Sequence, residues 1–119
     1  MLQTGVDLFE VERMRRAVAR HGDRFLRRIF TTRELALYSG NLASLAARFA
    51  AKEAVAKALA TGIGDVMWKE IEVLRGPKKE PLLHLHGAAR RRADELGLQT
   101  WSLSLSHTHD HAIAFVVAL

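Results

Sequence analysis

The sequence predicts an α+β fold, in which helices dominate the first half of the chain and an antiparallel hairpin ends it. Three observations support this prediction. The alanine-rich stretch Arg48–Gly64 has no proline and no glycine before Gly62, which is typical of a strong helix ended by glycines. Trp101–Ser106 alternates strictly between apolar and polar residues, as a half-buried strand does. Ala112–Leu119 is apolar throughout, which indicates a buried strand.

Local patterns place the remaining elements. Gln3–Phe9 is a short strand candidate, and Glu10–His21 turns helical until Gly22 interrupts it. Thr31 at an N-cap would place Glu34 at the capping-box position of a second helix. A break over Tyr38–Asn41 precedes the long helix. Two strands are expected over Met67–Arg75 and Leu82–His86, joined by a turn over Gly76–Pro81. A short arginine-rich helix is expected over Ala88–Leu96.

Composition limits the class of protein. The 119 residues suffice for a single domain, 1–119, with its own core, and the apolar content of 49% indicates a globular chain. The absence of cysteine excludes disulfides, thiolate metal sites and a cysteine nucleophile, and it fits a reducing compartment. No signal-peptide pattern and no apolar run of bilayer length is present. We therefore expect a soluble, cytoplasmic protein with no membrane partner.

The net charge of +5 would attract nucleic acid, anionic membrane, nucleotide phosphates or an acidic protein. Arginines recur three or four residues apart in the first helical region. On a continuous helix they would form one positive ridge, comprising Arg13, Arg16, Arg20, Arg24 and Arg27. Such a ridge is most often only a solvated face, but the absence of acids from it adds weight to an anionic partner.

Two acids lie in motif-like settings, Asp7 in the first strand and Glu53 in the long helix. Glu53 and Lys57 are one helical turn apart, beside an apolar stripe formed by Leu45, Phe49, Ala56 and Leu59. A surface ion pair is the plain interpretation of Glu53 and Lys57. Because magnesium takes one or two carboxylates and completes its shell with water and substrate phosphates, Asp7 and Glu53 also suit phosphoryl-type transfer.

Two further motifs have an ordinary and a functional interpretation. The loop Thr61–Gly64 could admit phosphate to its backbone amides, although it follows a helix C-terminus, whose partial negative charge repels anions. An ordinary helix cap is the alternative. His107, His109 and His111 stand at alternate positions and could bind zinc on an extended strand. We instead expect a hairpin turn that splays them, with His107 best placed for work in a cleft.

Four motifs together resemble the holo-acyl-carrier-protein synthases, which are small phosphopantetheinyl transferases. The motifs are Gly5–Leu8, Phe30–Glu34, Arg48–Ala54 continued by Lys57-Ala58, and Ser104–His107. The resemblance implies an α+β fold with a small antiparallel sheet packed on a long central helix. It also implies a magnesium-dependent transfer of 4'-phosphopantetheine from coenzyme A to a serine of apo acyl carrier protein, by a homotrimer with active sites at subunit interfaces.

The resemblance assigns roles residue by residue. Asp7 and Glu53 match the magnesium-binding acids, Lys57 matches the lysine near the transferred phosphate, and His107 matches the active-site histidine. Glu53, Lys57 and His107 are therefore the candidate catalytic residues, with a water activated by Glu53 or by the metal as an alternative base to His107. The residues expected around the coenzyme are Arg48, Lys57, Gly62, Gly64 and His107.

Arg13 matches an arginine on the helix that docks the acidic carrier, and Arg16, Arg20 and Arg24 would extend that surface. The chain departs from the family pattern at two places. Ala60 stands where many members have glycine, which predicts a longer helix there, and the Ser39–Ser44 break lacks the Lys and Arg that relatives use for the coenzyme's outer phosphate.

The alternative is a small basic nucleic-acid-binding domain that uses the arginine ridge. It leaves Asp7, Glu53 and the Ser-x-Ser-His motif without a role, and aromatic residues for base stacking make up only 7% of the chain. The sequence therefore favours the transferase, with the carrier and coenzyme A rather than nucleic acid as partners.

Overall fold

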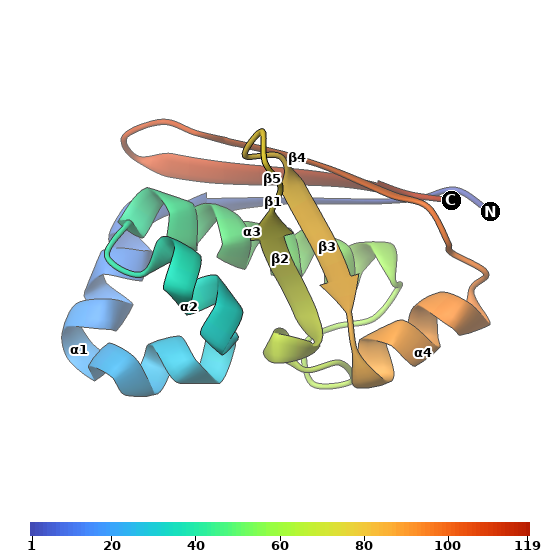
Figure 1. Ribbon diagram of the computed structural model, residues 1–119, viewed down its shortest axis with the longest axis horizontal. Helices are drawn as coiled ribbons and strands as arrows, with labels where there is room; N and C mark the ends of the chain where they lie inside the picture. Colours follow the sequence, from blue (N-terminus) through green and yellow to red (C-terminus); the bar gives the residue numbers. More distant parts are fainter.

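A computed structural model describes residues 1–119 and confirms the α+β fold with a small antiparallel sheet packed on a long central helix (Figure 1). The elements in chain order are β1 (Gln3–Glu10), α1 (Val11–Ile29), α2 (Thr32–Tyr38), α3 (Leu42–Ala58), the 3-10 helix η1 (Trp68–Glu70), β2 (Ile71–Arg75), β3 (Pro81–Leu85), α4 (Gly87–Glu95), β4 (Trp101–His107) and β5 (His111–Ala118).

The main sheet has the strand order β1-β5-β4, so the C-terminal strand lies in the middle. Both pairings are antiparallel, and one row of the sheet runs from Phe9 through Ala112 to His107. Alternate residues of β5 are buried against the helical side, while Ile113 and Phe115 are exposed on the outer face. The second sheet pairs only β2 with β3, as the predicted Gly-Pro turn required.

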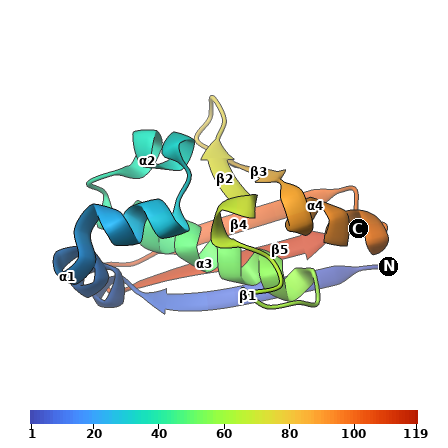
Figure 2. The same cartoon turned by 90° about the horizontal axis from the view of Figure 1, so that it is seen from below.

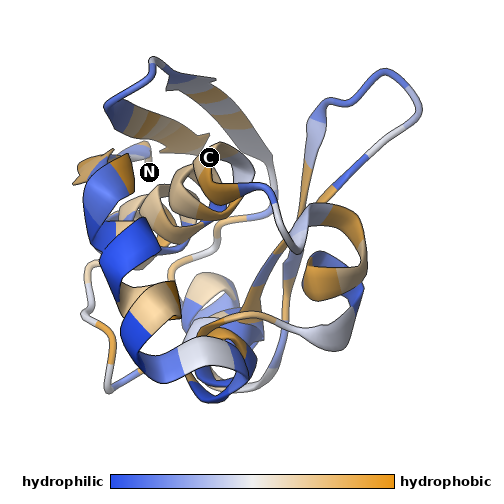
Figure 3. Cartoon of the chain, turned by 90° about the vertical axis from the view of Figure 1, so that its left-hand side faces the viewer, coloured by the Kyte–Doolittle hydropathy of each residue, from blue (hydrophilic) through white to orange (hydrophobic).

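The helix α3 is buried on nearly every side between the main sheet and the remaining elements (Figures 1 and 2). Its many alanines allow this, because a helix with short side chains can be approached closely from several directions. Figure 3 shows the contrast with α1, which is largely hydrophilic, whereas α3 is largely apolar. The central position of α3 makes it the element from which the candidate site residues project.

Gly5 sets how closely β1 approaches α3. A Cβ atom added at Gly5 would overlap the backbone carbonyl of Ala54, closer than any real contact. Only glycine therefore lets β1 lie directly on the helix. This contact brings the next inward-facing residue of β1, Asp7, toward the helix turn that carries Glu53 and Lys57.

The long helix ends earlier than predicted. α3 stops at Ala58, and Ala60 has a φ of +55°, so the expected lengthening of the helix at Ala60 is wrong. The amide of Ala60 donates to the Lys57 carbonyl at 3.0 Å, and that of Thr61 donates to the Ala56 carbonyl at 3.2 Å. This is a Schellman motif, which ends a helix by a left-handed residue.

The other predicted helix and strand boundaries agree with the structure or differ by a few residues. The break at Gly22 is confirmed, since its φ of 54° and ψ of −137° are not helical and divide α1 into two parts. Thr31 and Glu34 form the predicted capping box. The strand expected over Met67–Arg75 starts only at Ile71, because a 3-10 turn precedes it. No helix in the structure is both long and apolar enough to span a bilayer.

Candidate active site

Asp7, Glu53 and Lys57 meet where β1 crosses α3. The Lys57 Nζ donates to the carbonyl of Val6 at 2.7 Å and lies 3.4 Å from Asp7 Oδ1. The predicted partner of Lys57 was Glu53, one turn earlier on the same helix. The structure instead pairs the ammonium with the strand, because Gly5 brings β1 within its reach.

Glu53 is a half-buried carboxylate beside a second one. Burial raises its pKa above the usual range, the negative charge of Asp7 raises it further, and the positive charge of Lys57 opposes both effects. Two neighbouring carboxylates disfavour each other's charge, so a cation between them would be stabilised. Nowhere in the structure do three or more histidine, cysteine or acidic side chains gather as a metal centre.

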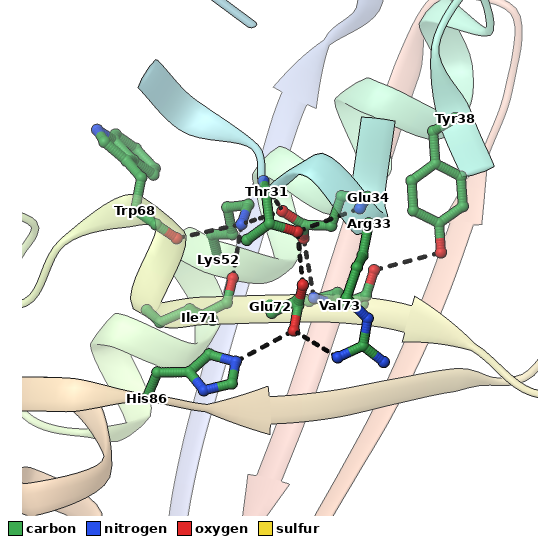
Figure 4. A network of polar contacts seen from close by, with 10 residues as sticks. All are labelled: Thr31, Arg33, Glu34, Tyr38, Lys52, Trp68, Ile71, Glu72, Val73 and His86. Carbon is green, nitrogen blue, oxygen red and sulfur yellow. Dashed lines mark hydrogen bonds and ion pairs between the residues drawn. The ribbon is translucent and has the colours of Figure 1, made fainter. Parts of the chain in front are cut away.

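A buried polar network lies among α2, α3 and β2 (Figure 4). Lys52 is fully buried, and its Nζ donates to Glu34 Oε1 at 2.8 Å, to the Ile71 carbonyl at 2.6 Å and to the Trp68 carbonyl at 3.1 Å. Burial lowers the pKa of Lys52, and the charge and hydrogen bond of Glu34 oppose that shift. Glu34 Oε2 also accepts from the amide of Val73 at 2.8 Å.

The network continues through Glu72 (Figure 4). Its carboxylate accepts from Thr31 Oγ1 at 2.6 Å and contacts His86 Nε2 at 3.1 Å and Arg33 Nη1 at 3.6 Å. Burial alone would raise the pKa of Glu72, but the hydrogen bonds from Thr31 and His86 and the charge of Arg33 together hold it below its usual value. The network links α2, β2 and α3 through side-chain hydrogen bonds.

Sequence reasoning missed the network, although one signal was present. Lys52 lies seven residues after Leu45 and seven before Leu59, so it belongs to the apolar stripe of the helix. A lysine on a buried stripe needs an anionic partner. The sequence predicts only a capping role for Glu34. In the structure Glu34 caps α2 and also pairs with Lys52.

Arg48 lies on α3 more than two turns before Lys57, away from the acidic cluster. Its guanidinium carbon is 4.2 Å from the centre of the Tyr38 ring, a cation–π distance. The Nε atom of Arg48 is buried and has no hydrogen-bond partner. Tyr38 is fixed by a 3.2 Å hydrogen bond from its hydroxyl to the Val73 carbonyl (Figure 4). The arginine is therefore held by a ring face, with its buried Nε–H group unpaired.

His107 lies on the opposite edge of the main sheet from Asp7. It ends β4, and the register places two strand spacings and two residues between their backbones, roughly 12 Å. His107 instead lines a cavity of about 460 Å³ with Arg15, Leu42 and His109. Within a single chain, His107 therefore lies away from Asp7, Glu53 and Lys57. His109 and His111 are exposed at the hairpin, as the predicted turn required.

The glycine loop and the arginine ridge complete the predicted set. Gly62 and Gly64 follow the end of α3, just beyond Lys57, and a Cβ atom added at either would have no neighbour within 4 Å, although the φ of +125° at Gly64 favours glycine. The predicted ridge is divided by the break at Gly22. Its first part lines a cavity of about 330 Å³ formed by Arg13, Arg16, Ala17, Arg20 and His21, and Arg24 lies beyond the break.

Comparison with known proteins assigns the family. Curated relatives are the holo-[acyl-carrier-protein] synthases of Herpetosiphon aurantiacus, 52% identical over 100% of this chain and 99% of the relative, and of Dehalococcoides mccartyi strain 195, 51% identical over 99% and 98%. The crystal structure of Helicobacter pylori holo-[acyl-carrier-protein] synthase in complex with coenzyme A superposes with a TM-score of 0.89 at 33% identity, covering 98% of this chain and 99% of that one.

The Neisseria meningitidis holo-[acyl-carrier-protein] synthase also has a TM-score of 0.89, at 36% identity over 98% of this chain and 97% of that one. None of these similarities favours the nucleic-acid-binding alternative. The model of the 4'-phosphopantetheinyl transferase superfamily matches residues 3–116, and this chain belongs to that family.

Proposed function

We propose that this protein transfers the 4'-phosphopantetheine group of coenzyme A to a serine of apo acyl carrier protein, as a single transferase domain over residues 1–119. The observation that carries the proposal is the convergence of Asp7, Glu53 and Lys57 where β1 crosses α3. Two carboxylates and an ammonium at one point suit a pyrophosphate and its counter-ion better than they suit any neutral substrate.

In the reaction, the serine oxygen bonds to the phosphorus that carries the pantetheine arm. The bond from that phosphorus to the bridging oxygen breaks, and adenosine 3',5'-bisphosphate leaves with the electron pair. The serine proton passes to a base. Charge accumulates on the phosphate oxygens during this exchange, so fixed positive charge nearby lowers the barrier.

Asp7 and Glu53 fit a magnesium ion. Magnesium commonly takes one or two carboxylates and completes its shell with water and phosphate oxygens. Burial and the charge of Asp7 raise the pKa of Glu53 although Lys57 lies nearby, and a bound cation would offset both effects. A bound magnesium would supply charge neutralisation at the pyrophosphate. The chain's own contribution is to hold both carboxylates in place, through the contact of Gly5 with α3.

Lys57 would contact the phosphates, since its ammonium is half exposed beside Asp7. The loop that contains Gly62 and Gly64, just beyond Lys57, would contact the phosphates of the coenzyme as well. Arg48, toward the other end of α3, would contact a different part of the coenzyme. His107 is the candidate base for the serine proton, and a water held by Glu53 or the metal is the alternative.

A homotrimer with shared sites would explain the position of His107. The outer face of the main sheet exposes Val6 and Leu8 beside Ile113 and Phe115, an apolar surface that a second subunit could cover. In this arrangement, one face of β5 packs on the core of its own subunit and the other would pack on a neighbouring subunit. In such an assembly, the His107 of one subunit could complete the acidic cluster of the next.

The cavity formed by Arg13, Arg16 and Arg20 would receive an acidic helix of the carrier protein. Charge complementarity of this kind acts mainly on the rate of encounter. We also propose a cytoplasmic location, since the absence of cysteine fits a reducing compartment.

Mass spectrometry of the carrier protein tests the function. Apo acyl carrier protein incubated with this protein, coenzyme A and magnesium should gain the mass of one phosphopantetheine group. A carrier whose acceptor serine is alanine and the Asp7→Asn variant serve as controls, and both should give no product. An unmodified carrier with the wild-type protein would refute the proposal.

A further inference from the structure

The end of α3 poses an electrostatic problem for any phosphate bound beside it. Helix C-termini carry partial negative charge on their last carbonyl groups. The loop that follows also contains Asp65, whose carboxylate accepts a 3.0 Å hydrogen bond from the hydroxyl of Thr61. A pyrophosphate at Gly62–Gly64 would thus face a negative helix end and a carboxylate. Lys57 is the only basic side chain in the last turn of α3, so a further cation at this helix end would have a clear physical purpose.

Arg92 of α4 is placed to be that cation. Its Nε donates to the Leu59 carbonyl at 3.0 Å, and Leu59 is the residue that caps α3. Arg92 is half buried, and its Nη1 lies 3.4 Å from Glu95 Oε2. The buried residues Ala89 and Ala93 fix this helix against the core. The guanidinium is therefore held against the end of α3 by the packing of another helix.

The neighbouring arginines of α4 do not share this arrangement. Arg90 pairs at 3.5 Å with Asp94 of the same helix, and both side chains are mostly exposed. Arg91 is exposed and makes no hydrogen bond or ion pair in the structure. Arg92 is thus the arginine of this run that contacts α3, and Arg91 provides a matched control with the same charge on the same helix.

We infer that Arg92 is a positioning residue for coenzyme binding: its charge, held against Leu59 by the hydrogen bond from Nε, offsets the negative end of α3 from which the Thr61–Gly64 loop departs. The inference rests on the proposed function, because it takes the phosphates of coenzyme A to lie at this loop. Arg92 acts through Leu59 and the loop, and it need not touch the coenzyme itself.

Calorimetric titration with coenzyme A tests the inference on the full-length protein. Arg92→Ala and Arg92→Gln should each weaken coenzyme binding about fivefold, which corresponds to the usual contribution of a cation at a helix C-terminus. Arg92→Lys should bind close to the wild-type value, because it keeps the charge. Arg91→Ala should leave the affinity unchanged. In steady-state kinetics, Arg92→Ala should raise KM for coenzyme A and leave KM for the carrier unchanged.

Gln at position 92 retains a hydrogen-bond donor without charge, so it separates an electrostatic role from a mechanical one. Coenzyme affinity in Arg92→Gln equal to wild type would overturn the inference, and so would equal weakening by Arg91→Ala and Arg92→Ala. If the wild-type protein itself neither bound coenzyme A nor modified the carrier, the proposed function would fail instead. The two failures are therefore distinct.

Discussion

Ala60 occupies a backbone conformation that favours glycine, with a φ of +55° at the end of α3. A non-glycine residue in the left-handed region costs roughly 1–2 kcal/mol. Ala60→Gly should therefore raise the free energy of unfolding by about 1 kcal/mol, measured by urea denaturation. Ala58→Gly, two residues earlier inside the helix, should lower it by at least about 1 kcal/mol. Destabilisation by Ala60→Gly would contradict the assigned cap.

Glu53 combines a cost in stability with a proposed role in activity. Burial and the charge of Asp7 raise its pKa in the folded state, so its ionised form disfavours folding. The full cost applies when the pH is above the pKa of Glu53 in the folded state. It disappears as the pH falls below the pKa of Glu53 in the unfolded state. Without divalent cations, Glu53→Gln should therefore unfold at a higher temperature than wild type at about pH 7, and the difference should vanish near pH 4.

The same substitution should reduce transfer to the carrier by about a hundredfold or more, because one of the two proposed metal ligands is lost. Magnesium should stabilise the wild-type protein against heat and should have little effect on Glu53→Gln. A variant that melts below wild type at neutral pH would show that Glu53 supports the fold instead of straining it.

At the scale of elements, the network around Lys52 fastens α3 to α2 and β2. Removal of one partner leaves an unpaired buried charge on Glu34, which costs about 3–5 kcal/mol. Lys52→Met should therefore lower the free energy of unfolding by about that amount in chemical denaturation. Lys57→Met places the same change five residues later on an exposed flank, where stability should change little and transfer should be lost.

If both lysine variants were equally stable, the buried pair would contribute little beyond an apolar contact of the same size. The two variants make the same chemical change at two positions, so a difference between them reflects position alone. Both side chains are lysines of one helix, yet one faces the core and the other faces the proposed substrate.

The division of α1 at Gly22 predicts a division of the arginine ridge. Arg13→Glu, in the first part, should weaken binding of acyl carrier protein about tenfold at low salt and leave coenzyme A binding unchanged. Arg28→Glu makes the same charge change beyond the break and should have a smaller effect. Surface plasmon resonance at two ionic strengths would measure both. Equal effects of the two variants would mean that only net charge matters.

At the scale of the whole molecule, a shared site predicts that two inactive variants can restore each other. His107→Ala supplies an intact Glu53, and Glu53→Gln supplies an intact His107. When the two are refolded together at equal amounts, about a quarter of the interfaces in a randomly assorted trimer would combine both intact residues. Transfer activity should therefore recover to about a quarter of wild type.

Glu53→Gln mixed with Lys57→Ala provides the matched control. Both residues lie on α3 of one chain, so no interface can combine two intact copies, and activity should stay absent. Sedimentation should give three chains per particle for each mixture. Failure of the first mixture to recover activity in a confirmed trimer would place the whole site within one chain.

Much of the fold could be predicted from local sequence, because the patterns involved act over a few residues. The capping box of Thr31 and Glu34, the break at Gly22 and the alternation in β4 each form within one element. The left-handed backbone of Ala60 could not be predicted, because glycine is the residue that usually adopts it. At Ala60 the path of the following loop imposes this conformation in spite of the side chain.

The type of most elements follows from local sequence, because the spacing of apolar residues reflects which face of each element is buried. The motifs also indicate Asp7, Glu53 and Lys57 as candidate site residues. Which of these residues meet depends on the packing of distant elements: Gly5 lets β1 lie on α3 and brings Asp7 to Lys57, while β5 separates His107, at the opposite edge of the sheet, from Asp7. Such contacts depend on elements far apart in the chain, and no short-range pattern encodes the distance between them.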